Sequence, residues 1–356
     1  MPQLGARPPL PVVITTNCAR FRLGADGKAT YEGPWTSPVP RVARAYWMDF
    51  SWFGLERHHI VIGRAMDRLW RSHDAYRGAH AGDVGRIALG QTTLAFSYYR
   101  GRRPLLYVAR YGGPEHTVAR GEWPVAFTDG KLVTQSNRST VVLRGLDGRR
   151  LRVLARRVSD VEAGPRSRGV VFRVKGKLFA FDGDRVRELA TLRKLGFTAK
   201  SLSIEPLGRL VALRDQRRLV ILDRAGRLVA KTPLPHGPKM ADGVSSAVVA
   251  NASATAVAFT ATSGNTAYGS RGSETVYVLR AGEHRARPVL TEKLLFKVCE
   301  RMADLSWRGR YLLYSDTELR AAVVDVSGHA APVELTPAIA RLPGLKRDGR
   351  FEVAWA

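Results

Sequence analysis

A short strand-like phrase of apolar residues recurs along nearly the whole chain. It appears as IVIG from Ile60, LAFS from Leu94, LVTQ from Leu132, VVFR from Val170, LVAL from Leu210, AVAF from Ala256 and LLYS from Leu312. Successive starts are 34, 38, 38, 40, 46 and 56 residues apart. A polar gap, a second apolar run and a Gly-centred turn follow each phrase. Self-similarity at about 40 residues with several strands per unit is typical of a β-propeller.

The pattern within one unit is clearest where four short runs follow one another. Residues 124–155 read PVAFTDG, KLVTQSN, TVVLRGLDG and RRLRVLA, and the same order recurs at 199–232 and 302–336. Apolar and polar positions alternate along these runs, and the turns pair Asp or Arg with Gly, which supplies positive φ at little cost. The pattern predicts antiparallel meanders. We expect the first strand of each unit to lie nearer the channel than the last. The inner strands should be the most apolar, and the third and fourth strands progressively richer in Arg.

Two kinds of segment depart from this pattern. LATLRKLG and TPAIARLPG are the best helix candidates and connect units, whereas residues 241–276 are rich in Ala, Ser, Thr and Gly and contain SGNTAYGSRGS, which predicts an extended hairpin. The segment AYWMDFSWFGLERHH is the most aromatic part of the chain. Its large side chains favour packing between blades, with a ligand-stacking platform as the alternative.

The two ends of the chain predict how the fold closes. The N-terminal stretch CARFRLGADGKATYEG resembles the second half of a unit, and RFEVAWA ends the chain on a strand-like run. We therefore predict an all-β propeller in which N- and C-terminal strands share a blade and close the ring. We predict seven blades, with six or eight as alternatives, in a single domain of residues 1–356 whose first eleven residues are irregular.

The chain is strongly basic. Its net charge is +26 at a pI of about 10.9, and 46 of its 57 basic residues are Arg. Such a balance attracts polyanions, but a codon bias toward Arg and the scattering of charges through every unit favour a solvated surface. We predict that one arginine-rich stretch is exposed and is the first candidate for polyanion binding: Arg149, Arg150, Arg152, Arg156, Arg157, Arg166 and Arg168.

Local motifs for catalysis are missing. The chain has no Gly-x-Ser-x-Gly and no phosphate-binding loop. His58 and His59 are adjacent, and the other histidines lack metal-ligand spacing. We assign no catalytic residue, no metal site and no cofactor. Acidic residues at turns are predicted to hold the turns through backbone amides, with calcium sites as the alternative: Asp129, Asp147, Asp182, Asp184, Asp223 and Asp325.

The two cysteines lie on either side of the expected closure. Cys18 belongs to the N-terminal strand pair and Cys299 precedes the last internal unit. Ring closure would bring them together as a disulfide, which implies an oxidising compartment, and two separate thiols are the alternative. We favour an extracytoplasmic location, with a leader absent from this chain, over a cytoplasmic one. No run of 18 apolar residues is present, so we expect no membrane span.

One unit carries a family resemblance. LSWRGRYLLYSDTE, from Leu305 to Glu318, resembles the blade motif of bacterial TolB-type and WD-repeat-type propellers, and Ser203 to Gln216 is similar to it in part. The Pro-Asp-Gly turn of TolB-type blades and the Trp-Asp dipeptide are both absent. The resemblance implies the fold and assigns no functional residue.

These observations favour a non-catalytic binding or scaffolding propeller that presents a rim surface to a protein or an anionic ligand. Two alternatives remain open. The first is an enzyme with a site assembled across blades that acts on a carbohydrate or polyanionic substrate. The second, which we do not favour, is nucleic-acid binding through an Arg-rich face.

Overall fold

The structure is a computed structural model of the 356-residue chain. It describes residues 6–15, 19–34, 46–48, 51–64, 67–77, 83–99, 103–137, 139–164, 169–198, 202–215, 217–234, 248–264, 271–295, 303–316, 320–342 and 352–356.

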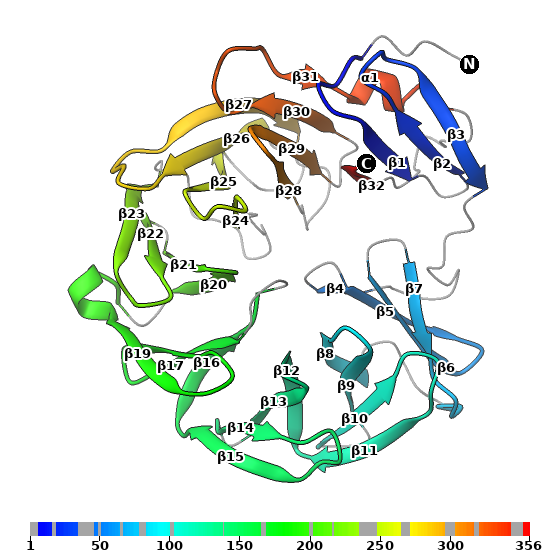
Figure 1. The fold of residues 1–356 in the computed structure, drawn as a ribbon, viewed down its shortest axis with the longest axis vertical. Helices are drawn as coiled ribbons and strands as arrows, with labels where there is room; N and C mark the ends of the chain where they lie inside the picture. The colour runs from blue at the N-terminus through cyan, green and yellow to red at the C-terminus, as the bar shows by residue number, and fades with distance from the viewer. Residues whose placement is uncertain are drawn as a thin grey trace. The chain divides into compact units, whose positions relative to one another are not determined.

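The described strands form eight four-stranded antiparallel sheets, as the predicted all-β propeller fold requires (Figure 1). Seven of the sheets are meanders in which strands adjacent in sequence are neighbours in the sheet. Contacts divide the chain into two compact units, one of residues 38–211 and 223–227, the other of residues 1–37, 212–222 and 228–356.

The unit that begins at residue 38 contains four complete sheets. The first two consist of β4 (Tyr46–Met48), β5 (Ser51–Glu56), β6 (His59–Arg64) and β7 (Asp67–Arg71), then β8 (Val84–Leu89), β9 (Thr93–Tyr99), β10 (Pro104–Arg110) and β11 (Glu115–Arg120). The next two consist of β12 (Glu122–Thr128), β13 (Lys131–Ser136), β14 (Val141–Arg144) and β15 (Arg150–Ala155), then β16 (Val158–Glu162), β17 (Val170–Val174), β18 (Lys177–Phe181) and β19 (Val186–Thr191). The 3-10 helix η2 (Leu192–Leu195) follows and lies in the predicted LATLRKLG connector.

The division between the units falls within the next sheet, whose strands are β20 (Ser203–Leu207), β21 (Leu210–Arg214), β22 (Arg218–Asp223) and β23 (Leu228–Pro233). The other unit has two further meanders. They consist of β24 (Val248–Ala250), β25 (Ala256–Gly264), β26 (Arg271–Arg280) and β27 (Arg287–Leu295), then β28 (Ala303–Arg308), β29 (Tyr311–Asp316), β30 (Ala321–Asp325) and β31 (Val333–Glu334). Helix α1 (Thr336–Ile339) lies in the second predicted connector. The pairing of β25 with β26 continues to Gly264 and Gly272, which confirms the extended hairpin.

The last sheet joins the two ends of the chain, as predicted. Its strand order is β3 (Ala29–Pro34), β2 (Ala19–Leu23), β1 (Val12–Thr15) and β32 (Glu352–Trp355), and β1 pairs antiparallel with both β2 and β32. This sheet is additional to the seven internal units. The described strands therefore form eight sheets, and the number of blades, seven with six or eight as alternatives, stays a prediction.

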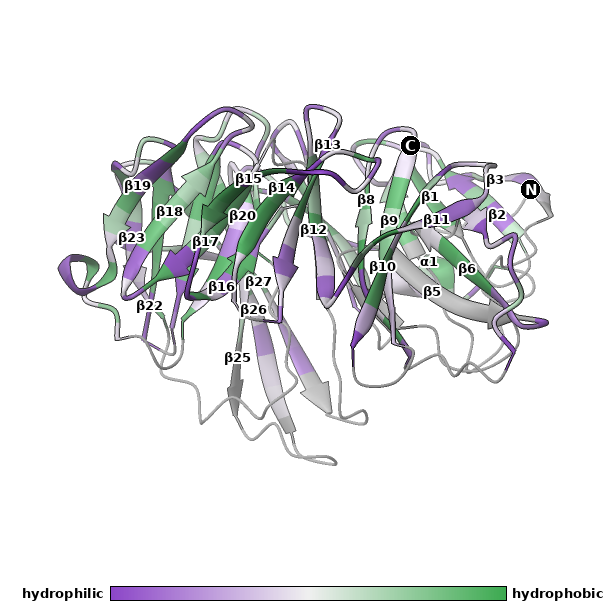
Figure 2. Cartoon of the chain, turned by 90° about the horizontal axis from the view of Figure 1, so that it is seen from below, coloured by the Kyte–Doolittle hydropathy of each residue, from purple (hydrophilic) through white to green (hydrophobic). Residues whose placement is uncertain are grey.

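The recurring apolar phrase is a middle strand. It forms the second strand of six sheets, and at Ile60 it belongs to β6, a third strand. All five residues of β21 and of β30 are buried, whereas the first strands β12 and β20 alternate. The hydropathy colours in Figure 2 show the same contrast between β14 and β12. The expectation that first strands are the most apolar is wrong, because a middle strand is covered on both faces and paired on both edges.

The turn between the third and fourth strand of a sheet, here called the third turn, packs on the fourth strand of the preceding sheet. The amide of Gly282 donates to Val229 O (2.8 Å), and Trp70 Nε1 donates to Gly113 O (3.0 Å). At Gly148 and Gly226 a Cβ would lie only 2.5 Å from Val118 O and 2.0 Å from Leu189 O. These glycines have φ of +87° and +83°, so they allow both the turn and the close backbone approach.

Aspartates hold four of these turns through backbone amides, as predicted. Asp147, Asp182, Asp223 and Asp325 each accept a hydrogen bond from an amide two residues further on, at 2.8–3.3 Å. No such bond is found for Asp129 or Asp184 within the described part of the chain. The turn role is therefore confirmed at four of the six positions.

Three carboxyl oxygens in the described strands are buried without a hydrogen-bond partner, and two of them, on Asp160 and Asp325, lie in ion pairs with arginines. Asp304 lies on β28, and its Oδ1 is buried and unpaired among the described atoms, although the residue as a whole is only partly covered. Burial raises the pKa of Asp304 to about 6, and a hydrogen bond with the Leu305 backbone offsets this only in part. The charged form is therefore disfavoured in the folded state.

We predict that Gly148→Ala destabilises the protein by about 2–4 kcal/mol, because strain from positive φ adds to the clash with Val118. The control is Gly130→Ala in the same sheet, where φ is also positive (+70°) and nothing lies within 4 Å of the added Cβ. It should cost only about 1 kcal/mol. Chemical denaturation measures both, and equal losses would show that the third turn makes no close contact.

We predict that Asp304→Asn stabilises the protein by about 1–2 kcal/mol at pH 7.5, a value reduced from the full pKa shift because the residue is partly exposed. The raised pKa means that the folded state binds more protons between about pH 4 and pH 6, so stability falls as pH rises through this window. The substitution should remove this dependence of stability on pH and should give no gain in stability near pH 4. Thermal unfolding at both pH values tests this, with Asp184→Asn at an exposed position as control. A gain of the same size at both pH values would contradict the assignment.

Candidate functional site

The arginine-rich stretch follows the edge of one sheet. β15 is the fourth strand of its sheet, and Arg149, Arg150, Arg152, Arg156 and Arg157 lie on it or at its two ends. We call these five residues the arginine edge. The third turn before β15 is closed by Asp147, whose Oδ1 accepts from the Arg149 amide at 3.0 Å. This turn therefore fixes the backbone position of Arg149 and Arg150 at the start of β15.

All five side chains of the arginine edge are exposed, which confirms the predicted exposure at these positions. Arg152 Nη1 donates to the backbone oxygen of Asp184, 2.8 Å away in the third turn of the next sheet. The other four form no ion pair with any described carboxylate. Arg166 and Arg168 lie outside the described residues. Nine consecutive residues, 149–157, thus carry five exposed positive charges and no acidic residue.

An exposed edge strand also has a structural need for charge. Unpaired edge amides and carbonyls can pair with another chain, and charged side chains discourage such pairing. β15 is short and carries Arg at alternate positions 150 and 152 beside the partly exposed Leu151. Protection of the edge and attraction of an anion use the same side chains, so the geometry is compatible with both.

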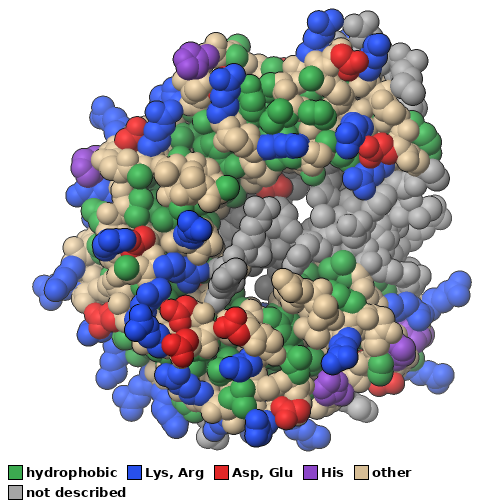
Figure 3. Space-filling model, viewed as in Figure 1, with side chains coloured by type: hydrophobic (Ala, Val, Ile, Leu, Met, Phe, Trp, Pro, Cys, Tyr) green, Lys and Arg blue, Asp and Glu red, His purple; other side chains and the backbone are tan. Residues whose placement is uncertain are grey.

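Basic side chains are not confined to this edge. In Figure 3, Lys and Arg occur over most of the described surface on the face shown, and they gather at the lower left, where Figure 1 draws β15 and β19. Acidic side chains are fewer, and several lie together over the region of β16. The positive field on this face is therefore broad, with a local increase near the arginine edge.

The acidic residues of this region line a pocket that the sequence did not predict. Asp160 and Glu162 of β16 and Ser203 and Glu205 of β20 line a cavity of about 300 Å³. Asp160 forms an ion pair with Arg173 on the neighbouring strand, and Ser203 Oγ donates to Glu205 Oε1 at 3.2 Å. The pocket has the volume of a small-ligand site and a negative lining, but Asp160 is paired with Arg173 and Ser203 is bonded to Glu205.

A second acidic side chain is paired deep in the same unit. Glu122 of β12 accepts hydrogen bonds from Arg144 Nε (2.8 Å), Arg144 Nη2 (2.5 Å) and Thr134 Oγ1 (2.6 Å). Burial alone would raise the pKa of Glu122, but the hydrogen bonds from Arg144 and Thr134 outweigh burial and hold that pKa below its ordinary value. A buried, bidentate pair of this kind positions strands, and it leaves no free group for chemistry.

A third network lies in the other unit. The fully buried Tyr314 donates its hydroxyl toward two buried carboxylates, Glu274 Oε2 at 2.7 Å and Asp316 Oδ2 at 3.0 Å. These residues come from β26 and β29 of adjacent sheets. The network joins the two sheets through their interior, and sequence reasoning missed it because its members are 40 residues apart in the chain.

Several predicted features cannot be placed. Cys18 and Cys299 lie outside the described residues, so the disulfide stays a prediction. The side chains of the aromatic segment from Ala45 to Glu56 are also outside them. No group of three or more His, Cys, Asp or Glu side chains that could hold a metal occurs in the described part of the chain. Among the same residues, no helix is long and apolar enough to cross a membrane.

The pocket residues that the sequence analysis missed are linked by their positions in the fold. Asp160, Glu162 and Glu205 occupy first strands of two consecutive sheets, where no spacing rule links them. The one available signal was an excess of acidic residues on first strands in an otherwise basic chain.

Comparisons with known proteins identify no family for this chain. No family model matches the chain, and no curated protein matches it. Among solved structures, it is similar to AztD from Citrobacter koseri (10% identity, 91% of this chain and 94% of that chain, TM-score 0.49). It is also similar to BamB from Moraxella catarrhalis (13%, 82% and 87%, TM-score 0.44) and to the WD40 domain of SCAP from fission yeast (8%, 90% and 93%, TM-score 0.42). These identities are too low to transfer a function.

Proposed function

We propose that this chain is a non-catalytic binding propeller that holds an anionic ligand on the arginine edge. The observation that carries the proposal is the exposure of Arg149, Arg150, Arg156 and Arg157 with no described carboxylate in ion-pair contact. Paired surface arginines would be neutralised locally. Unpaired ones are available to neutralise the charges of a polyanion, and release of the cations condensed on that polyanion drives binding.

The arrangement along the strand supports an extended ligand. A six-residue strand is roughly 20 Å long, and arginines stand at both of its ends. Guanidinium groups spread over this length match a chain with repeated negative charges better than they match one small anion. The ordered third turn at Asp147 and the hydrogen bond from Arg152 to the next sheet hold the strand in place, so little ordering is needed on binding.

The test is a fourfold charge reversal, Arg149→Glu, Arg150→Glu, Arg156→Glu and Arg157→Glu, with heparin as the probe. Retention on heparin should shift to clearly lower salt, because four contacts become repulsive. For duplex DNA as a second probe, loss of four phosphate contacts should flatten the slope of log affinity against log salt by roughly 3–4.

The matched control reverses four other exposed arginines, Arg77, Arg103, Arg110 and Arg193, with the same change in net charge. It should weaken retention much less. Equal weakening in the two variants would mean that net charge alone attracts the probes, and the proposal would fail. A loss seen with DNA and not with heparin would make nucleic acid the ligand class.

A further inference from the structure

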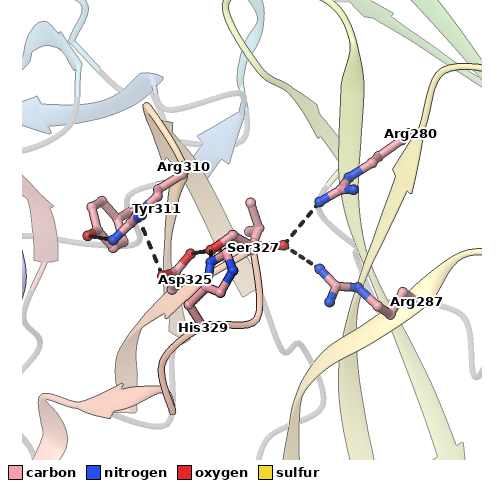
Figure 4. Close-up of polar contacts among 8 residues, drawn as sticks. Arg280, Arg287, Arg310, Tyr311, Asp325, Ser327 and His329 are labelled. Carbon is pink, nitrogen blue, oxygen red and sulfur yellow. Dashed lines mark hydrogen bonds and ion pairs between the residues drawn. The ribbon is translucent and has the colours of Figure 1, made fainter.

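We propose that Arg280, Arg287 and the third turn at Val326 form a binding site for a phosphate or sulfate group. Arg280 ends β26 and Arg287 begins β27, so one hairpin presents both side chains. Both guanidinium groups donate to the same backbone oxygen, that of Val326, at 3.5 Å for Arg280 Nη2 and in a close contact for Arg287 Nη2. Figure 4 shows the two side chains converging on this oxygen from one side.

Two positive charges are held together here by a neutral group. Because both nitrogens lie within 3.5 Å of one oxygen, they are at most 7 Å apart. Neither arginine forms an ion pair within the described part of the chain, and both are exposed. Each guanidinium has five N–H donors, so most of them remain uncommitted after the bond to Val326. An oxyanion between them would relieve the repulsion and accept several of these donors.

The nearby carboxylates are committed elsewhere. Glu283 Oε2 accepts from the backbone amide of Arg280 at 2.9 Å and thereby closes the hairpin turn. Asp325 Oδ1 accepts from the Ser327 amide (2.9 Å) and hydroxyl (2.5 Å), and Oδ2 lies 3.6 Å from Arg310 Nε. In Figure 4, Arg310 and Tyr311 lie on the opposite side of Asp325 from Arg280 and Arg287. Neither carboxylate forms an ion pair with Arg280 or Arg287 in the described part of the chain, so both arginines can accept an external anion.

The turn is shaped to let an arginine approach. Gly328 has φ of +80°, and a Cβ there would lie 2.9 Å from Arg287 Nη1. The hydrogen bonds of Asp325 with Ser327 and of Ser327 Oγ with His329 Nδ1 (2.7 Å) fix the conformation of the turn. The site is thus built from ordered backbone on one side and two side chains on the other, so its geometry exists before a ligand arrives. It shares no residue with the arginine edge and does not depend on it.

The test is titration with inorganic phosphate, followed by isothermal calorimetry, of the full chain and of the variant Arg280→Gln with Arg287→Gln. We expect the variant to bind phosphate at least tenfold more weakly. The control, Arg285→Gln with Arg341→Gln, removes the same charge from two exposed arginines of the same unit and should bind as the unchanged chain does. Equal loss in both variants, or no loss in the first, would overturn the site.

A second measurement needs no substitution. The side-chain Nε resonances of Arg280 and Arg287 should shift on addition of phosphate, whereas that of Arg285 should not; an absence of any shift at the two arginines would overturn the proposal. Replacing inorganic phosphate by O-phosphoserine separates the possible sources of the group. Tighter binding of O-phosphoserine supports a phosphomonoester ligand, and tighter binding of the inorganic ion supports free phosphate.

Discussion

The close packing of third turns on the fourth strand of the preceding sheet, found at Gly113, Gly148, Gly226 and Gly282, is the contact on which both proposed sites depend. At Gly148 and Gly226 the backbones approach so closely that a methyl group would not fit, and at Gly282 the contact is a direct backbone hydrogen bond. The contact uses backbone atoms, so it can recur while the side chains around it vary. It holds part of the fourth strand in place, although that strand remains the edge of its sheet.

Both proposed anion sites lie at this repeated contact. Arg149 and Arg150 directly follow the third-turn residue Gly148, and Arg152 reaches the third turn of the next sheet. Arg280 and Arg287 flank one third turn and donate to Val326 in another. In each case an ordered backbone junction carries arginines, and at least one of them donates to a backbone oxygen of the neighbouring sheet. Sites on ordered turns need little reorganisation on binding, which is why such junctions suit recognition.

Much of the architecture could be predicted from the sequence, because local patterns determine it. The four runs read at 124–155, at 199–232 and at 302–336 correspond strand by strand to three observed sheets, and the shared terminal sheet followed from the half-unit at each end. The order of strands within the unit at Ile60 was not evident, since aromatic residues replace the usual aliphatic run before it. Exposure of the arginine edge was predictable from its density of charge. The convergence of Arg280 and Arg287 on Val326 was not, because the partners are 46 and 39 residues apart and meet only through the packing of two sheets.

The turns help to explain why positive charges at the surface lack acidic partners. Asp147, Asp182, Asp223 and Asp325 use carboxylate oxygens to accept backbone amides. Burial alone would raise the pKa of Asp182 and Asp223, but these bonds outweigh it and hold both pKa values low. At Asp325 the hydrogen bond from the Ser327 hydroxyl is the main cause of a lowered pKa. Asp223 also forms an ion pair with Arg227 through Oδ2, and its Oδ1 still accepts the backbone amide of Arg227 in the turn. Other carboxylates, such as Glu122, are consumed inside the sheets. With 31 acidic residues against 57 basic ones, this use of carboxylates leaves some arginines, such as Arg149 and Arg150, without an ion pair to any described carboxylate. The same turns that order the fold therefore concentrate its uncompensated charge where a ligand can reach it.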